Sequence, residues 1–484
     1  MLVPKERVVS DLTKMFGSEA VVTDREAIKD YDADNNNLAK AFGCYLNPLP
    51  ICVLNLASEE GIAAALKYCN DNGVSVIPRT GASSYEGLLT AVNDTTVVID
   101  ASAMNKVIKL DIDNMMVTCQ CGVPLEALEK RLNAMGYTTG HAPQSIPVAQ
   151  MGGLVATRSI GQFSTYYGGI EDMVCGLRAV MPNGDLVEIR NVPRRSAGPD
   201  LRHMFIGSEG ALAFITEVTV KIFSFYPDDY WKGGYIMPDM DAGFKAIRDI
   251  IAAGFRPSVV RLYDKPDYDH NFGSIELEEN QAFMFFVAEG PPAIAKATGD
   301  GVHEIAVKNG AYHIGSKAVE HWLIHRNDHC NTFGKPETRQ KLRDLPIIYK
   351  TTEIAASHTD IVKIYNNVRN NVPKKIENLV LLGGHVSHAY QNGVNVYFVY
   401  RVKINSPETS EQEHQAVINA ICDEVLKEET GGCVHHHGMG KQRVKFAPRE
   451  HGSSYPLMVG LKQLMDPNGI MNPGALVAGP ASGI

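Results

Sequence analysis

The sequence contains no apolar run near the roughly 20 residues that a membrane-spanning helix requires. Its first residues, 1–7, lack the features of a secretory signal peptide, so a cytoplasmic protein is expected. Acidic residues outnumber basic ones by 55 to 46, and the formal net charge is −9. This balance argues against nucleic acid as a main partner.

Several other signatures are missing. The nine cysteines form no Cys-x-x-Cys pair, which fits scattered reduced thiols better than a disulfide framework or a zinc ribbon. The chain lacks a Walker loop and the Gly-x-Gly-x-x-Gly of a dinucleotide-binding fold. It is also too long for one ordinary core: 484 residues with a hydrophobic content of 44% predict a globular enzyme of two or three domains.

A turn of small residues occupies positions 78–87, directly after the apolar run 74–77. The pattern around it predicts a strand at 52–54, a helix capped by Ser58 and ended by Gly73, and a second strand that leads into the turn. Small residues leave backbone N–H groups open to an oxyanion. Such a turn is often only a turn, but its delivery by a strand–helix–strand unit favours a diphosphate cradle.

Two further stretches expose backbone in the same way. Residues 140–169 are rich in glycine and proline, and an irregular segment of this length is uncommon inside a domain unless it serves a function. Residues 207–210 read Gly-Ser-Glu-Gly and precede a predicted strand at 214–222. A flat ligand could lie against both stretches.

These three stretches resemble the FAD-binding domain of the vanillyl-alcohol-oxidase family, also called the PCMH type. The similarity extends from about Ile51 to Phe223 and is most specific at 152–158 and 205–217. It implies an α+β fold with a two-part FAD-binding domain and an α/β cap domain built on an antiparallel sheet. FAD should be bound non-covalently, because the turn contains no histidine. The related lactate and glycolate dehydrogenases have glycines where Thr80 and Ala82 stand, which implies a slightly altered cradle.

The resemblance also implies which residues meet FAD. The diphosphate lies on the first turn, the flavin ring against the glycine-rich stretch, and the adenosine side near 209–215. The residues expected at the cofactor are Pro78, Arg79, Thr80, Gly81, Ala82, Ser83, Ser84, Gln144, Ser145, Gln150, Gly153, Thr157, Arg158, Gly161, Glu209, Gly210 and Ile215.

Composition and resemblance together predict four regions. They are an N-terminal helix with its lead-in (1–45), the FAD-binding domain (46–226), a substrate or cap domain (227–440), and a C-terminal helix and tail that packs back on the FAD domain (441–484). Within the cap, residues 353–372 are expected to form one helix. Alternation over 394–403 predicts a strand with Tyr397 and Arg401 on one face. His321, His325 and His329 would share a helix face, where ordinary histidines are more frequent than a metal site.

Within the family, the glycolate oxidase and D-lactate dehydrogenase branch uses two histidines and a glutamate that can hold a divalent metal. Here the segment from Gly384 carries Tyr397 in place of the second histidine, and His436 replaces the glutamate. A hard cation would lose its anionic ligand by this exchange, so no metal is expected.

The run His435-His436-His437, together with Arg261 and Tyr397, resembles alkyldihydroxyacetonephosphate synthase instead. That enzyme uses flavin N5 to hold a substrate carbon while an acyloxy group is exchanged for an alkoxy group. These five residues are the candidate catalytic set.

Chemistry leaves the reaction open at this point. A histidine paired with Tyr397 can take a hydroxyl proton as hydride leaves for flavin N5, while Arg261 fixes an anionic or phenolic group. The favoured prediction is an FAD-dependent oxidoreductase that oxidises a small hydroxylated substrate. The alternatives are a redox-neutral synthase-like transferase and, less favoured, a non-catalytic flavin-binding protein. The electron acceptor, whether oxygen, a quinone or an electron-transfer flavoprotein, is undetermined, and a homodimer is one expectation for assembly.

Overall fold

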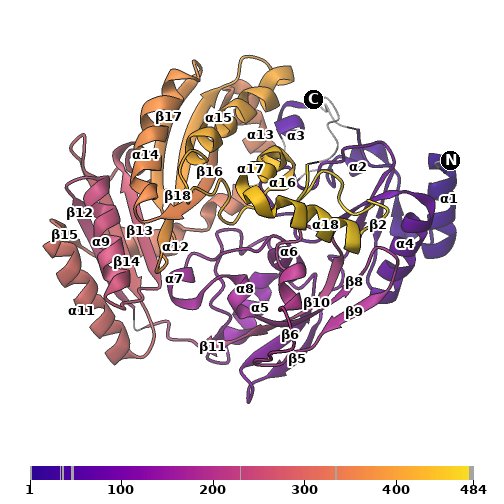
Figure 1. Ribbon diagram of the computed structural model, residues 1–484, viewed down its shortest axis with the longest axis horizontal. Helices are drawn as coiled ribbons and strands as arrows, with labels where there is room; N and C mark the ends of the chain where they lie inside the picture. The colour runs from indigo at the N-terminus through magenta and orange to yellow at the C-terminus, as the bar shows by residue number, and fades with distance from the viewer. Residues whose placement is uncertain are drawn as a thin grey trace.

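The computed structural model describes residues 3–32, 34, 38–44, 48–228, 230–332 and 335–478. It has three main sheets. Figure 1 shows two of them in the indigo-to-magenta half of the chain and the third in the rose-to-orange half, with the yellow C-terminal segment between the two. None of the described helices has the length and apolarity to cross a bilayer.

The first sheet runs β1–β2–β4–β3, with β2, β4 and β3 parallel. Its strands are β1 Val21–Val22, β2 Cys52–Asn55, β3 Ser75–Arg79 and β4 Thr96–Asp100. Helix α4 (Glu59–Asn72) connects β2 to β3; Ser58 accepts the N–H of Gly61 at its start, and Gly73 ends it at φ 66°. The predicted strand–helix–strand unit is therefore confirmed, and it brings the 78–87 turn to the end of β3.

The second sheet is antiparallel, in the order β5–β6–β10–β8–β9. Its strands are β5 Val107–Asp111, β6 Met116–Gln120, β8 Val174–Val180, β9 Leu186–Ile189 and β10 Phe214–Lys221, and a small pair joins β7 Tyr137–Thr138 to β11 Phe223–Ser224. The other helices of this half are α1 Lys5–Phe16, α2 Arg25–Ile28, α3 Leu38–Phe42, α5 Leu125–Asn133, α6 Met151–Ala156, α7 Ser164–Tyr167 and α8 Ile170–Met173. Part of the predicted lead-in, 35–37, lies outside the described residues.

The third sheet has seven antiparallel strands in the order β15–β12–β14–β13–β17–β18–β16. The strands are β12 Trp231–Met237, β13 Val259–Asp264, β14 Ala282–Ala288, β15 Tyr312–Gly315, β16 Ile347–Ser357, β17 Leu379–Val386 and β18 Gly393–Lys403. The helices are α9 Met240–Ala252, α10 Lys265–Asn271, α11 Pro292–Lys308, α12 Lys317–His325, α13 Pro336–Asp344, α14 Asp360–Asn371 and α15 Ser410–Val425.

Alternation along β18 decides which face of this sheet meets the site. Val396, Phe398 and Tyr400 pack into a core with residues of α9, α14 and α15, as the sequence pattern predicted. Tyr397 and Arg401 point to the opposite face and line a cavity. The side chains of one strand thus separate the hydrophobic core from the candidate site.

The expectation of one helix over 353–372 was wrong at its start. Residues 347–357 form β16, which pairs with β18 along its whole length, and the helix begins only at Asp360. Glu353 favours helices, but here its carboxylate is fully buried between cationic side chains, so tertiary contacts override local propensity.

The C-terminal segment contains α16 Gly440–Arg443, α17 Ala447–His451 and α18 Tyr455–Met465. Met471 bridges to Val76 of β3, and Lys462 donates to the carbonyl of Ala211 at 2.7 Å. The segment around Met471 therefore lies against the same strand that carries the first turn.

Candidate active site

A narrow cavity follows the first turn between the two sheets of the N-terminal half. Thirteen of the seventeen residues expected at FAD line it: Pro78, Arg79, Thr80, Gly81, Ala82, Ser83, Ser84, Gln150, Gly153, Thr157, Glu209, Gly210 and Ile215. The segments that supply them are β3, α6 and the approach to β10, which lie far apart in the sequence. The structure brings the three open-backbone stretches to one place.

The lining of this cavity fits a close-lying diphosphate ligand. A Cβ on Gly81 would lie 2.6 Å from the carbonyl oxygen of Val148, and Gly210 adopts φ +68° with its Cα against the ring of Pro78. Only glycine allows this approach of two backbones. Among the described residues, the buried Oε1 of Gln150, which lines the cavity, has no hydrogen-bond partner, as expected of a group that awaits a polar ligand.

Some predicted cofactor residues have side chains that are engaged elsewhere. Arg79 pairs with Asp100 and its guanidinium lies over Tyr31, so its cationic group is already engaged within the protein. Glu209 accepts the N–H of Met439 at 2.5 Å, and burial raises the pKa of its carboxyl to about 7.

Of the remaining predicted positions, Gln144 and Ser145 line the second cavity described below, whereas Arg158 and Gly161 line neither. Arg158 is 59% exposed and pairs with Glu171, while the Cα of Gly161 packs against the backbone of Ala142.

A second cavity of about 640 Å³ opens beside the first and shares Ser83, Ser84 and Thr157 with it. Its volume is that of a pocket for a small organic ligand. Strands β13, β16, β17 and β18 form one wall, while residues of the glycine-rich stretch form another.

Histidines 321, 325 and 329 also line this second cavity, but they do not share one helix face. Helix α12 ends at His325, which pairs with Asp328 at 2.7 Å, and His329 lies in a following 3-10 turn.

Arg261 lines this cavity together with two other arginines, Arg326 and Arg401. Its side chain is 5% exposed, its guanidinium lies 5.0 Å from the ring centroid of Trp322, and its one hydrogen bond among the described residues reaches the hydroxyl of Tyr263 at 3.5 Å. The described part of the chain places no carboxylate in an ion pair with it, and its Nε lacks a partner. A buried cation without an anion favours an anionic ligand.

A row of hydrogen bonds begins at Tyr397, which lines the cavity. Its hydroxyl lies 2.5 Å from His436 Nε2, the Nδ1 of His436 lies 2.7 Å from His435 Nδ1, and His435 Nε2 lies 2.8 Å from the hydroxyl of Tyr390. Burial lowers the pKa of His435 to about 4 and that of His436 further below its ordinary value. Both imidazoles are therefore neutral near pH 7.

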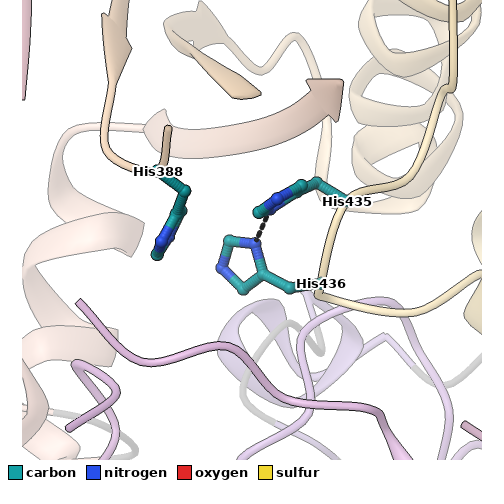
Figure 2. Close-up of side chains that lie close together, drawn as sticks. All are labelled: His388, His435 and His436. Atoms are coloured by element: carbon teal, nitrogen blue, oxygen red, sulfur yellow. Dashed lines mark hydrogen bonds between the residues drawn. The ribbon is translucent and has the colours of Figure 1, made fainter. Parts of the chain in front are cut away.

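Figure 2 shows that His388, from the segment after β17, lies beside His435 and His436. Each pair of ring centroids in this group lies 4.9 to 5.1 Å apart. The Nδ1 of His388 forms a 2.7 Å hydrogen bond with the Oγ of Ser164.

Glu353 fixes the backbone of the histidine run. Its Oε1 accepts the N–H groups of His435, His436 and His437 at 2.9 to 3.2 Å, and its Oε2 lies 2.7 Å from His437 Nδ1. Burial disfavours the charged forms of both partners, but Glu353 raises the pKa of His437 to about 9, and Arg443 with His437 holds the pKa of Glu353 well below its usual range.

Arg443 completes this network. Its guanidinium is fully buried, pairs with Glu353 and Glu86, and donates to the carbonyls of Cys433 and Gly438. Glu353, Arg443, Glu86, His388 and Tyr390 were not singled out as site residues from the sequence. Nothing local to Glu353 could have revealed it, whereas Glu86 lies within the small-residue turn at 78–87 and Arg443 closely follows the histidine run.

All five predicted catalytic residues converge on one region. Arg261, Tyr397, His436 and His437 line the second cavity, and His435 lies directly behind His436. Ser83, Ser84 and Thr157 border both cavities, so a ligand in the first adjoins this polar set.

Comparisons with known proteins identify the family of the chain. Residues 50–190 match the model of an FAD binding domain, and residues 234–476 match that of the C-terminal domain of FAD linked oxidases. The chain is 44% identical to an uncharacterized FAD-linked oxidoreductase, YgcU, of Escherichia coli K12 over 98% of this chain and 99% of the relative.

More distant relatives divide between two chemistries. A mitochondrial D-lactate dehydrogenase (cytochrome) of Saccharomyces cerevisiae is 26% identical over 97% of this chain and 79% of its own. A solved structure of alkyldihydroxyacetonephosphate synthase superposes with a TM-score of 0.77 at 25% identity, covering 98% of this chain and 85% of that one.

Proposed function

The chain belongs to the family of FAD-linked oxidases, and from that premise we propose that it oxidises a small hydroxylated substrate that carries an anionic or phenolic group. Bound FAD supplies the hydride acceptor. The observation that carries the proposal is that one cavity is lined by two features. They are Arg261, whose guanidinium forms no ion pair with a described carboxylate, and the hydrogen bond between Tyr397 and His436.

Arg261 binds and orients the substrate. Because its guanidinium is buried and cation–π contact with Trp322 holds it in place, an incoming carboxylate, phosphate or phenolate gains a charge-assisted hydrogen bond at little conformational cost. The hydroxyl-bearing carbon then lies toward Tyr397.

Tyr397 and His436 move the proton. Burial raises the pKa of the Tyr397 hydroxyl, so tyrosinate is not the resting form, and the neutral Nε2 of His436 at 2.5 Å is the acceptor. As the substrate's hydroxyl proton passes to Tyr397, the tyrosine's own proton passes to His436. The cationic His437, whose ring centroid lies 4.6 Å from that of His436, favours negative charge developing nearby but disfavours a second positive charge on His436. His436 therefore gives up its Nδ1 proton as its Nε2 accepts one.

The redox-neutral alternative is a transferase resembling alkyldihydroxyacetonephosphate synthase. The same three groups can bind a phosphate and deprotonate an adjacent carbon, and the likeness over 98% of the chain supports this candidate. A protein that merely stores flavin has no use for the hydrogen-bonded row behind Tyr397.

The test is anaerobic mixing of the FAD-bound protein with a panel of 2-hydroxy acids, hydroxyalkyl phosphates and phenols while flavin absorbance is followed. We expect bleaching with at least one anionic compound and none with the matched uncharged alcohol. The result that would overturn oxidation is an unbleached flavin throughout, combined with exchange of an acyloxy group on an acylated dihydroxyacetone phosphate, which would establish the transferase. If the flavin bleaches, the electron acceptor is sought among oxygen, quinones and electron-transfer flavoproteins.

A further inference from the structure

We propose that His435 and Tyr390 extend the Tyr397–His436 pair into a proton outlet that leads from the cavity to the protein surface beside Arg158. This inference rests on the proposed function, which places a proton on Tyr397. Tyr390 and His435 would be positioning residues, since neither lines the cavity.

Geometry supports a continuous path. Three successive contacts of 2.5, 2.7 and 2.8 Å join Tyr397, His436, His435 and Tyr390, and each imidazole uses one nitrogen toward each neighbour. With both imidazoles neutral, only two placements of the protons satisfy every hydrogen bond in the row. Either each group donates to its neighbour on the Tyr390 side, or each donates to its neighbour on the Tyr397 side. A row with two equivalent polarities can pass a proton by switching from one to the other.

The proton balance follows from these links. The proton of Tyr397 passes to His436 Nε2, the Nδ1 proton of His436 passes to His435 Nδ1, and the Nε2 proton of His435 passes to Tyr390. The hydroxyl proton of Tyr390 then leaves to water or Ser164. One proton has moved outward and no imidazole has changed its net charge.

The outer end of the row reaches the surface. Tyr390 is partly exposed, and the charges of Glu171 and Arg158 act on its hydroxyl. Arg158 is itself 59% exposed, and it pairs with Glu171 at 3.2 Å. The predicted cofactor residue Arg158 thus lies where a proton would meet solvent.

A divalent cation is the other occupant that the triangle of His388, His435 and His436 suggests. Charge argues against it. The cationic His437 adjoins His436, Arg261 acts on His388, and the nearest carboxylate, Glu353, is already paired with Arg443 and His437. Three neutral ligands would leave a buried double charge uncompensated.

The experiment compares wild-type FAD-bound protein with Tyr390→Phe by ¹⁵N NMR of labelled histidines, without substrate. Without the tyrosine hydroxyl, His435 Nε2 has no acceptor, so its proton should move to Nδ1 and force His436 into the Nε2–H tautomer. We therefore expect the ¹⁵N signals of His436, two links away, to shift to that tautomer. Tyr400→Phe is the control, because it removes a similar buried tyrosine–histidine bond, to His414, on the other face of β18.

A second measurement uses any compound that bleaches the flavin. In Tyr390→Phe we expect flavin reduction to slow by roughly tenfold or more. The solvent deuterium isotope effect on this rate should increase, and added imidazole should partly restore the rate. His435→Asn, which removes the central link, should behave in the same way if Tyr390→Phe is poorly folded.

Two outcomes would overturn the proposal: unchanged His436 signals in a folded Tyr390→Phe, or one equivalent of zinc or manganese in the purified protein that is lost in His388→Ala. The NMR result requires no turnover, so failure of the outlet is distinguishable from failure of the proposed oxidation.

Discussion

The three consecutive histidines have different environments although they share one loop. Burial keeps His435 and His436 neutral, with the pKa of His435 near 4, whereas Glu353 outweighs burial at His437 and raises its pKa to about 9. One residue of the run is therefore a fixed cation while its neighbours remain free to exchange protons. Identical residues acquire separate roles because of what each ring faces.

Tyr397→Phe tests the proton step at this scale. The change removes only a hydroxyl, so FAD content and substrate binding should persist while flavin reduction slows by roughly 10² or more. Single-turnover stopped-flow spectroscopy measures this rate, with Tyr400→Phe as the control for loss of a buried hydroxyl. Near-normal rates with FAD fully bound would mean that Tyr397 is only a packed strand residue.

Arg261→Met should instead weaken binding. Losing one charge-assisted contact costs about 1.5 to 3 kcal/mol, so the substrate dissociation constant should rise roughly 10- to 150-fold with a smaller effect on the reduction rate. Titration of flavin reduction rate against substrate concentration separates the two quantities. Arg449→Met, which removes an exposed pair with Asp423, should change neither. A reduced rate at unchanged affinity would contradict the anchoring role.

The 433–443 loop is the element that decides the shape of the site. It folds around one carboxylate: Glu353 of β16 accepts three successive N–H groups, and Arg443 at the end of the loop donates to the carbonyls of Cys433, at its start, and Gly438, in its middle. Strand β16 thus fixes the histidine run, which forms neither a helix nor a strand.

Glu353→Gln should expose this dependence. The amide keeps an acceptor oxygen but removes the charge, so His437 loses its main anionic partner, its pKa should fall, and the stability loss should be about 3 to 5 kcal/mol near neutral pH. The raised pKa of His437 contributes stability that is full below its ordinary value near 6.5 and disappears as pH rises through about 9. The lowered pKa of Glu353 contributes stability present above about 4.5 and lost as pH falls further.

Thermal unfolding of wild type and variant from pH 5 to pH 10 measures this prediction. The gap between their midpoints should be widest near pH 6 and should narrow toward pH 10. A gap of constant size across the alkaline range would show that the ion pair does not provide the difference.

For the whole molecule, the C-terminal segment connects the cofactor cavity to the cap. The N–H groups of Met439 and Gly440 bind the carboxylate of Glu209, the side chain of Asn472 donates to the Glu209 carbonyl, and Lys441 donates to Thr90. Cofactor binding should therefore stabilise both halves of the chain together.

Ser83→Asp tests that coupling, because it places charge and volume in the shared lining of the two cavities. Added FAD at 100 times its dissociation constant should stabilise the wild-type protein by about 2.7 kcal/mol, whereas the variant should neither retain FAD nor gain stability. Differential scanning fluorimetry and acid release of FAD measure both effects. Ser10→Asp, on the exposed face of α1, is the control, and equal FAD retention by Ser83→Asp would contradict the cradle.

Sequence alone determined the features that depend on local pattern. The cap and end of α4, the alternation along β18 and the small-residue turn follow from residue types at fixed spacing, because backbone sterics and side-chain period act between near neighbours. The FAD-linked family was inferred by resemblance, from the turn and the stretches 152–158 and 205–217. The sequence also picked out Tyr397, Arg261 and the histidine run, although their convergence was known only by resemblance.

Tertiary structure alone decided the protonation and the partners of those groups. A pKa depends on burial and on charges that come from residues distant in the sequence. Nothing in the sequence around Glu353 or Arg443 indicated that the two form a buried ion pair. The link from His435 to Tyr390 joins residues 45 positions apart through a single 2.8 Å contact, and no periodicity in the chain encodes such a contact.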